Sequence, residues 1–151
     1  MLIEEFAGGM ALPWWIVVLR LMGAAVFCAV IGLEREWRRH SAGLRTHMLV
    51  GVAAATFALI TLQLVEWPWE SPELIRLDPI RLVEATTAGV AFLAAGMIVL
   101  TRGQVRNLTT GAGMWLAAAI GLATGLGLWP IALIAALLGI VIIGVLDRLT
   151  G

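Results

Sequence analysis

The ionisable side chains that could carry chemistry gather in one short stretch, residues 34–47. Carboxylates and imidazoles are the groups used in general acid–base catalysis and in metal binding. However, His40 and His47 are seven residues apart, have no nucleophile beside them, and lie among four arginines that disfavour cation binding. We therefore expect no enzymatic activity, no metal and no cofactor. The candidate polar residues of this stretch are Glu34, Arg35, Glu36, Arg45, Thr46 and His47.

The elements that must position these residues belong to an unusually apolar chain. Of its 151 residues, 61% are hydrophobic and 13% are charged, and the mean hydropathy is +0.98. A soluble domain of this size needs much more polar surface, so we predict an integral membrane protein. We expect the lipid bilayer as its surroundings and no nucleic-acid partner. The single cysteine, Cys28, excludes an internal disulfide and is best explained as a small packing residue.

Apolar runs of bilayer-spanning length predict an all-α fold. We expect one transmembrane domain, residues 1–151, that forms a bundle of five helices of about 20 residues each. The charge-free run 108–146 is too long for one span, and the Gly- and Pro-containing segment 125–130 divides it. The predicted spans are 13–33, 46–65, 79–100, 107–127 and 129–147.

Short polar segments mark the predicted helix boundaries. Residues 32–47 are predicted to be a loop, with Thr46 as a helix N-cap at its end. Asp78 followed by Pro79 is typical of a helix start. A tight turn at 101–107 should lead into a helix that Asn107 caps.

Charge distribution predicts the orientation in the membrane. Seven arginines fall on the side that holds the 34–47 loop, and two fall on the opposite side with six of the ten acids. Arginine-rich loops stay in the cytoplasm, so we expect an outside N-terminus and a cytoplasmic C-terminus. Five of the seven tryptophans then lie near the outer interface, where tryptophan is favoured: Trp14, Trp15, Trp67, Trp69 and Trp129.

Small residues recur at helical spacing in two of the spans. Gly113, Ala117, Gly121 and Gly125 form one such ridge, and Thr87, Ala91 and Ala95 form another. Small residues let membrane helices approach closely. The ridges therefore indicate packing within the chain, with a homo-oligomer as the alternative.

Ionisable residues within the predicted spans need partners. Arg20 and Glu84 lie at similar depths from the outer ends of the first and third helices, so we predict an ion pair between them. The alternative is that each reaches the membrane interface separately. Glu34 is predicted to face the bundle interior and meet Arg102 or Arg106, with a solvated rim as its alternative.

Several motifs in register resemble those of one family of bacterial inner-membrane proteins, the MgtC/SapB family. They are Gly32–Glu36, Ala42–His47, Asp78-Pro79 with Arg81, Phe92–Gly96, and Val105–Thr110, which includes Arg106, Asn107, Thr109 and Thr110. Arg20 also matches an arginine in the first helix of members. The chain departs from the pattern at Ala85, Ala94 and Asn107, where members commonly have Gln, Gly and Gly. Many members add a soluble C-terminal domain that we do not expect here.

The resemblance implies a non-enzymatic regulator in the bacterial inner membrane. Members act in adaptation to low magnesium and, in pathogens, in survival inside host cells, and the best-known ones are associated with restraint of the proton-translocating ATP synthase. The alternative is transport of magnesium or another ion, which the family's name suggests. A magnesium pathway needs oxygen ligands, and Glu84 is the single carboxylate placed within a predicted span, apart from Asp147 at the last residue of the fifth.

Overall fold

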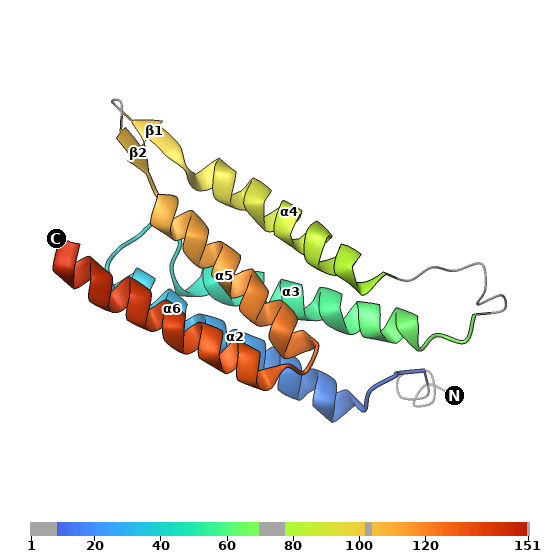
Figure 1. The fold of residues 1–151 in the computed structure, drawn as a ribbon. Helices are drawn as coiled ribbons and strands as arrows, with labels where there is room; N and C mark the ends of the chain where they lie inside the picture. The colour runs from blue at the N-terminus through green and yellow to red at the C-terminus, as the bar shows by residue number, and fades with distance from the viewer. Residues whose placement is uncertain (1–8, 70–77, 102–103, 151) are drawn as a thin grey trace.

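A computed structural model describes residues 9–69, 78–101 and 104–150 of the chain. Over these residues the fold consists of five helices and one short hairpin (Figure 1). The helices are α2 (Trp14–Trp37), α3 (Leu44–Val65), α4 (Pro79–Met97), α5 (Leu108–Gly125) and α6 (Trp129–Thr150). The hairpin pairs β1 (Val99–Thr101) with β2 (Gln104–Arg106) in antiparallel register. The prediction of a helical bundle is confirmed, and the hairpin replaces the simple turn predicted at 101–107.

Four helices, α2 to α5, are long and apolar enough to cross a membrane. The helix α6 adds an apolar stretch over residues 129–144. The chain is therefore a multi-pass membrane protein, as the composition predicted. The acidic segment from Glu70 to Leu77 lies outside the described residues, as do Arg76 and Arg102.

The helix boundaries follow local signals in some places and depart from them in others. Asp78 caps α4 by accepting a hydrogen bond from the Ile80 backbone N–H at 3.0 Å, and Pro79 is the first helical residue, as predicted. The prediction for Thr46 is wrong, because α3 begins at Leu44 and the N-cap is Gly43. The span predicted to reach residue 100 ends as a helix at Met97, where the chain turns into β1.

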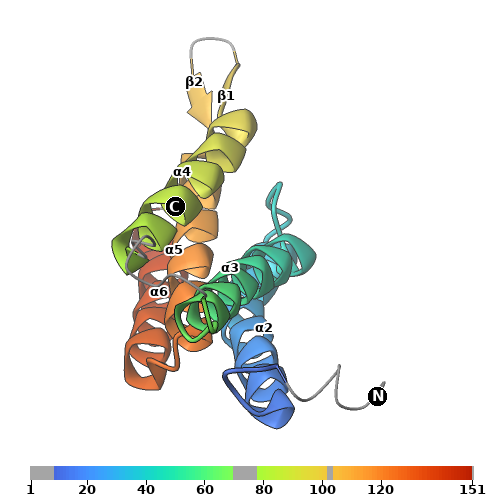
Figure 2. The ribbon, with the colours of Figure 1, turned by 90° about the vertical axis from the view of Figure 1, so that its right-hand side faces the viewer.

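The helix α5 is the centre of the bundle, because each of the other four helices packs against it (Figures 1 and 2). About two thirds of its residues are buried, against roughly a fifth in α2, α3 and α4. The helix α4 lies at the edge, against α5 and with few contacts to α3. The bundle therefore has one interior helix that can position groups from all the others.

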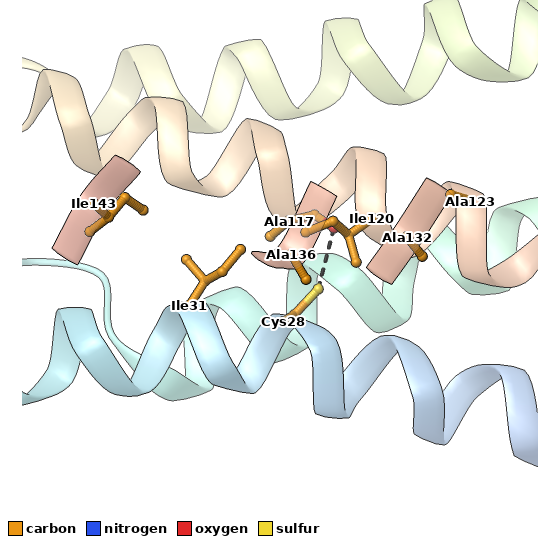
Figure 3. Packing of buried hydrophobic residues seen from close by; sticks show 8 residues of the cluster. All are labelled: Cys28, Ile31, Ala117, Ile120, Ala123, Ala132, Ala136 and Ile143. Atoms are coloured by element: carbon orange, nitrogen blue, oxygen red, sulfur yellow. Dashed lines mark hydrogen bonds between the residues drawn. The ribbon is translucent and has the colours of Figure 1, made fainter. Parts of the chain in front are cut away.

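Small and branched side chains fill the space between α2, α5 and α6 (Figure 3). Ile31, Ile120 and Ile143 interleave there with four alanines, and Cys28 donates an Sγ–H hydrogen bond to the Ala117 carbonyl oxygen at 3.4 Å. Cys28 is fully buried, which confirms its predicted role as a small packing residue.

The predicted glycine ridge of α5 packs within the chain against α3. A Cβ atom added at Gly121 would overlap the carbonyl oxygen of Gly51, and one added at Gly125 would lie 2.6 Å from the Ala55 carbonyl oxygen. Gly51 and Ala55 are four residues apart, as are Gly121 and Gly125, so the two helices run in the same direction with their backbones in contact. The second predicted ridge differs, since Ala91 and Ala95 on α4 are exposed.

This contact generates a stability prediction. We expect Gly121→Ala to lower the stability of the folded protein by about 1–3 kcal/mol, because the added methyl group forces α3 and α5 apart. Thermal unfolding in detergent would measure the change.

Gly89→Ala is the matched control, because a Cβ atom at this mid-helix position has no neighbour within 4 Å. It should not lower the melting temperature. Equal losses for the two variants would show that the backbone contact of α3 and α5 does not limit stability.

Candidate functional site

The polar stretch singled out in the sequence forms a compact centre where α2 turns into α3. The helix α2 continues through Glu34, Arg35 and Glu36 to Trp37, so the stretch predicted as a loop is helical at both ends. Residues 38–43 alone connect the two helices, and Arg39 adopts a left-handed conformation there, with φ 55°. We call this end of the bundle the turn end.

Glu36 joins the last turn of α2 to the first turn of α3. One of its carboxylate oxygens accepts a hydrogen bond from the Leu44 backbone N–H at 3.0 Å. A helix N-terminus has free N–H groups and a partial positive charge, so a carboxylate there is stabilising. Glu36, on the preceding helix, therefore satisfies a free N–H group in the first turn of α3, which is the role that was predicted for Thr46.

Two glycines of the motif allow this close approach. A Cβ atom at Gly32 would lie 2.7 Å from the Leu44 Cα atom, and one at Gly43 would overlap the Glu36 carboxylate. A larger residue at Gly32 would push the two helix ends apart, whereas one at Gly43 would displace the Glu36 carboxylate from the Leu44 N–H group. The spacing of these glycines thus reflects the geometry of the turn.

Arg35 crosses from α2 to α5 inside the bundle. Its side chain is 2% exposed, and its Nη2 group donates to the Thr110 hydroxyl at 3.4 Å. Its Nη1 atom lies 3.9 Å from a carboxylate oxygen of Glu34. A buried guanidinium is costly without such partners, so this group fixes how α2 and α5 align.

His47 is fully buried on the first turns of α3. Its Nδ1 atom donates to the Gly43 carbonyl oxygen at 2.8 Å, across the first turn of α3. In a neutral ring the other nitrogen, Nε2, is then an acceptor. It has no hydrogen-bond partner in the described part of the chain and faces Gly113 of α5, at 3.1 Å from where a Cβ atom would lie.

The predicted contact of Glu34 with Arg106 is wrong. Glu34 forms an ion pair with Arg38, one helical turn further along α2, and Arg106 is exposed on β2. Arg102, the other predicted partner, lies outside the described residues. Arg45 and Thr109 are also exposed, so the motif divides into a buried part and a solvent-facing part.

Asn107 has a different role from the predicted cap. It adopts a left-handed conformation, with φ 65°, and its side chain makes no capping hydrogen bond to α5. Its Nδ2 group instead donates to the Met97 carbonyl oxygen at 3.0 Å, which ties the end of α4 to the start of α5 across the hairpin. Asparagine tolerates this conformation better than most residues, so Asn107 can replace a glycine here.

The predicted pair of Arg20 with Glu84 is also wrong. Arg20 donates from Nη1 to the Gly125 carbonyl oxygen at 2.8 Å, at the end of α5, and lies beside the left-handed Gly127, with φ 81°. Glu84 is exposed on α4, as is Arg81. Since α2 packs on α3, α5 and α6, Arg20 meets the free carbonyl groups of α5 before it can reach α4.

The contacts at the turn end join the end of α2 to the start of α3 and to the first turn of α5. No group of three or more metal-binding side chains occurs within the described ranges. Of the polar groups at the turn end, Arg35 and His47 are buried and bind the Thr110 hydroxyl and the Gly43 carbonyl oxygen, while Glu36, Arg39 and Arg45 are exposed. The sequence placed Gly32 and Gly43 within motifs and Gly113 on a packing ridge, but it did not predict their contacts with Leu44, Glu36 and His47.

The family model described as "MgtC family" matches residues 21–151. The chain belongs to the MgtC family. It is 33% identical over 136 residues to the "Putative magnesium transporter YhiD" of Escherichia coli (strain K12), covering 88% of this chain and 61% of that protein. It is 38% identical over 104 residues to "Protein MgtC" of Salmonella typhimurium (strain LT2), covering 69% of this chain and 41% of that protein. No solved structure matches the chain.

The matched region contains every residue of the turn-end centre, and Arg20 lies just before it. The chain spans between 41% and 61% of the length of these relatives. Family membership therefore applies to the membrane-spanning part, as the sequence motifs indicated.

The Arg35 contact gives a second prediction. Thr110→Val removes the hydroxyl and keeps the shape, so we expect a loss of about 1.5–3 kcal/mol in unfolding free energy, because a buried charged donor loses its partner. The neighbouring Thr109 is exposed, and Thr109→Val should change stability by less than about 0.5 kcal/mol. Thermal unfolding of both variants in detergent measures the difference, and similar values for the two would contradict the role of Thr110.

The Arg20 contact gives a third prediction. We expect Arg20→Leu to lower stability by about 1.5–3 kcal/mol through the lost hydrogen bond to Gly125. In a double-mutant cycle with Glu84→Leu, the two effects should add to within about 0.5 kcal/mol, since the residues do not touch. A larger coupling energy would contradict this result and would support the Arg20–Glu84 ion pair that the sequence predicted.

Proposed function

We propose that this protein is a non-enzymatic regulator in the bacterial inner membrane that acts in adaptation to low magnesium and, in pathogens, in survival inside host cells. Its action would be exerted by contact with a membrane partner such as the proton-translocating ATP synthase. In this proposal the N-terminus is outside and the turn end faces the cytoplasm. Family membership and the resemblance of the motifs support the proposal.

The closed interior of the bundle is the observation that carries it. Where the structure describes side chains, α5 is in backbone contact with α3, and alanines fill the space toward α2 and α6. The carboxylates of Glu36, Glu66, Asp78 and Glu84 are all exposed, and Glu34 is engaged with arginines at the turn end. A bundle of this kind offers contacts on its outside rather than a pathway through its middle.

Exposed cationic and aromatic groups at the turn end give the proposed contact surface. Trp37 is 81% exposed, and Arg39 and Arg45 are exposed beside it. Arg45 lies in the first turn of α3, where the partial positive charge of the helix end opposes a cation. Its charge therefore does not serve the stability of α3, which favours a role in orientation or in binding a partner.

Transport of magnesium is the competing function, and the name of the Escherichia coli relative favours it. Magnesium keeps several water molecules and prefers carboxylate oxygens, so a transporter needs a hydrated acidic path. The described part of this chain has no such path through the bundle, because its carboxylates lie at the rim or on the outer face of α4.

The fourth prediction tests the regulatory function. ATP-driven proton uptake should be lower in inverted inner-membrane vesicles that contain this protein than in vesicles without it. Arg45→Glu should remove the effect, because it reverses the charge of the proposed contact surface. A matched charge change at the other end, Glu66→Lys, should leave the effect intact. Unchanged proton uptake in the presence of the protein would contradict regulation of this enzyme.

Two further measurements complete this experiment. A cysteine introduced as Ser41→Cys should react with an impermeant reagent in inverted vesicles and not in intact cells, because the turn end is proposed to be cytoplasmic. Liposomes that contain the purified protein should show no magnesium influx. Influx that saturates with magnesium would support transport in place of regulation.

A further inference from the structure

An apolar groove of about 350 Å³ runs between α3 and α4, and we call it the α3–α4 groove. Its walls include Leu49 and Phe57 on α3 and Gly89 and Leu93 on α4. Behind it lies the buried cluster through which both helices pack on α5. The two helices have few contacts with each other and diverge toward the turn end (Figures 1 and 2). Leu49, Phe57 and Leu93 are at least half exposed, so the groove is open toward lipid.

The groove covers the depth of one lipid leaflet. On α3 it extends from Leu49 to Phe57, which lie four and twelve residues after Arg45, or about 6 and 18 Å along the helix. On α4 it extends from Leu93 to Ala85, which lie four and twelve residues before the end of that helix, so the two walls match in depth. Half of a hydrocarbon core is roughly 15 Å thick. The groove therefore begins just below the headgroups at the turn end and ends near the bilayer centre.

This length fits an acyl chain better than a helix. A membrane-spanning helix is about 10–12 Å wide and extends through both leaflets. Past the groove, Leu82 of α4 packs against the buried cluster that contains Ala58. A separate hollow of about 290 Å³ lies further out, near Asp78 and Arg81. The α3–α4 groove thus closes at the depth where the acyl chains of one leaflet end.

An exposed arginine lies directly above the groove. A ridge of side chains at every fourth residue of α3 begins at Arg45 and continues with three residues that line the groove: Leu49, Ala53 and Phe57. The 22 residues of α3 span about 33 Å, so Arg45 in its first turn lies at the boundary of the hydrocarbon core. Arg106, exposed on β2, adds a second positive charge beyond the end of α4. Positive charge at this depth favours an anionic headgroup.

We propose that the α3–α4 groove binds an anionic phospholipid of the turn-end leaflet, with one acyl chain in the groove and the phosphate group at Arg45. A guanidinium group matches the geometry of phosphate and can donate two parallel hydrogen bonds to it. A zwitterionic lipid carries a compensating cation beside its phosphate, so the site prefers a lipid with net negative charge. Arg45 also belongs to the proposed contact surface, but lipid binding is measured without a protein partner and does not depend on the proposed function.

Photo-cross-linking in lipid vesicles tests the site and is the fifth prediction. The full chain is placed in phosphatidylcholine vesicles that contain phosphatidylglycerol with a photoreactive group near the end of one acyl chain. Mass spectrometry of the cross-linked peptides then locates the chain end. We expect the adducts to concentrate at the deep end of the groove, around Phe57 and Ala85. Leu138, an equally exposed residue at a similar depth on α6, is the reference position for general lipid contact.

Two glycines of α4 give a matched pair of variants. Gly89→Leu extends a side chain into the groove without a steric conflict, because a Cβ atom there has no neighbour within 4 Å. It should lower the adduct yield in the groove by about tenfold. Gly96→Leu is the control, because its Cβ atom also has no neighbour within 4 Å and Gly96 does not line the groove. It should leave the yield within about twofold of the parent value.

A third variant tests the headgroup. In the parent chain the phosphatidylglycerol probe should give about fivefold more adduct in the groove than the same probe with a phosphatidylcholine headgroup, which is the effect expected of one basic residue near an anionic lipid. Arg45→Gln should bring the two yields close to each other. Arg81→Gln, an exposed arginine at the other end of α4, should leave the preference unchanged. Gel-filtration profiles of the detergent-solubilised variants show whether each chain is folded.

Four outcomes would overturn the proposal. The first is an adduct yield around Phe57 no higher than around Leu138. The second is a folded Gly89→Leu variant that keeps the parent yield. The third is a folded Arg45→Gln variant that keeps the headgroup preference of the parent chain. The fourth is efficient formation of disulfide-linked dimers by Gly89→Cys in the same vesicles, which would assign the groove to a second copy of the chain, since Cys28 is buried.

Discussion

The backbone contact between α3 and α5 is the constraint on which the rest of the structure depends. Within a bilayer the lipid is as apolar as the helices, so burial of apolar side chains does little to hold helices together. Close packing must do so instead, and it requires glycine at Gly121 and Gly125, where a side chain would overlap the backbone of α3. With α5 held this closely, its remaining faces become the surfaces on which α2, α4 and α6 pack.

Polar contacts then set how α2 runs along α5. Arg20 binds the carbonyl group of Gly125, Cys28 binds that of Ala117, and Arg35 binds the hydroxyl of Thr110. The number of residues between successive contacts is the same on both helices, but the order along α5 is the reverse of the order along α2. A single antiparallel register of α2 and α5 therefore satisfies all three contacts. The electrostatics differ at the two ends. Arg20 meets the partially negative C-terminus of α5, whereas Arg35 meets its N-terminal turn and has Glu34 beside it as a counterion.

Hydropathy and the spacing of small residues predicted the helices, the break before Trp129 and the ridge of α5, because bilayer thickness and backbone contact act on local sequence. The partners of charged residues could not be predicted in this way. Depth along a helix suggested Arg20 and Glu84 as a pair, but depth does not tell which helices are neighbours. Similarly, the capping of α3 by Glu36 depends on how tightly the turn closes. The segments on either side of Arg102 and Gly103 contain β-branched residues, which favour strands. A hairpin could therefore have been predicted there in place of a simple turn.

The packing also divides the bundle into parts that differ in how firmly they are held. The helices α2, α3 and α5 share backbone contacts and buried polar groups, whereas α4 meets α5 through an apolar cluster around Val90 and Met114 and through the Asn107 contact at the hairpin, and has few contacts with α3. Between α3 and α4 an apolar groove of about 350 Å³ opens, lined by residues such as Leu49, Phe57 and Leu93. Elements with few buried contacts are those that a protein can displace at the lowest cost. In a bundle with a closed interior, any change of arrangement on binding a partner is therefore expected to take place at α4 rather than among the helices that enclose α5.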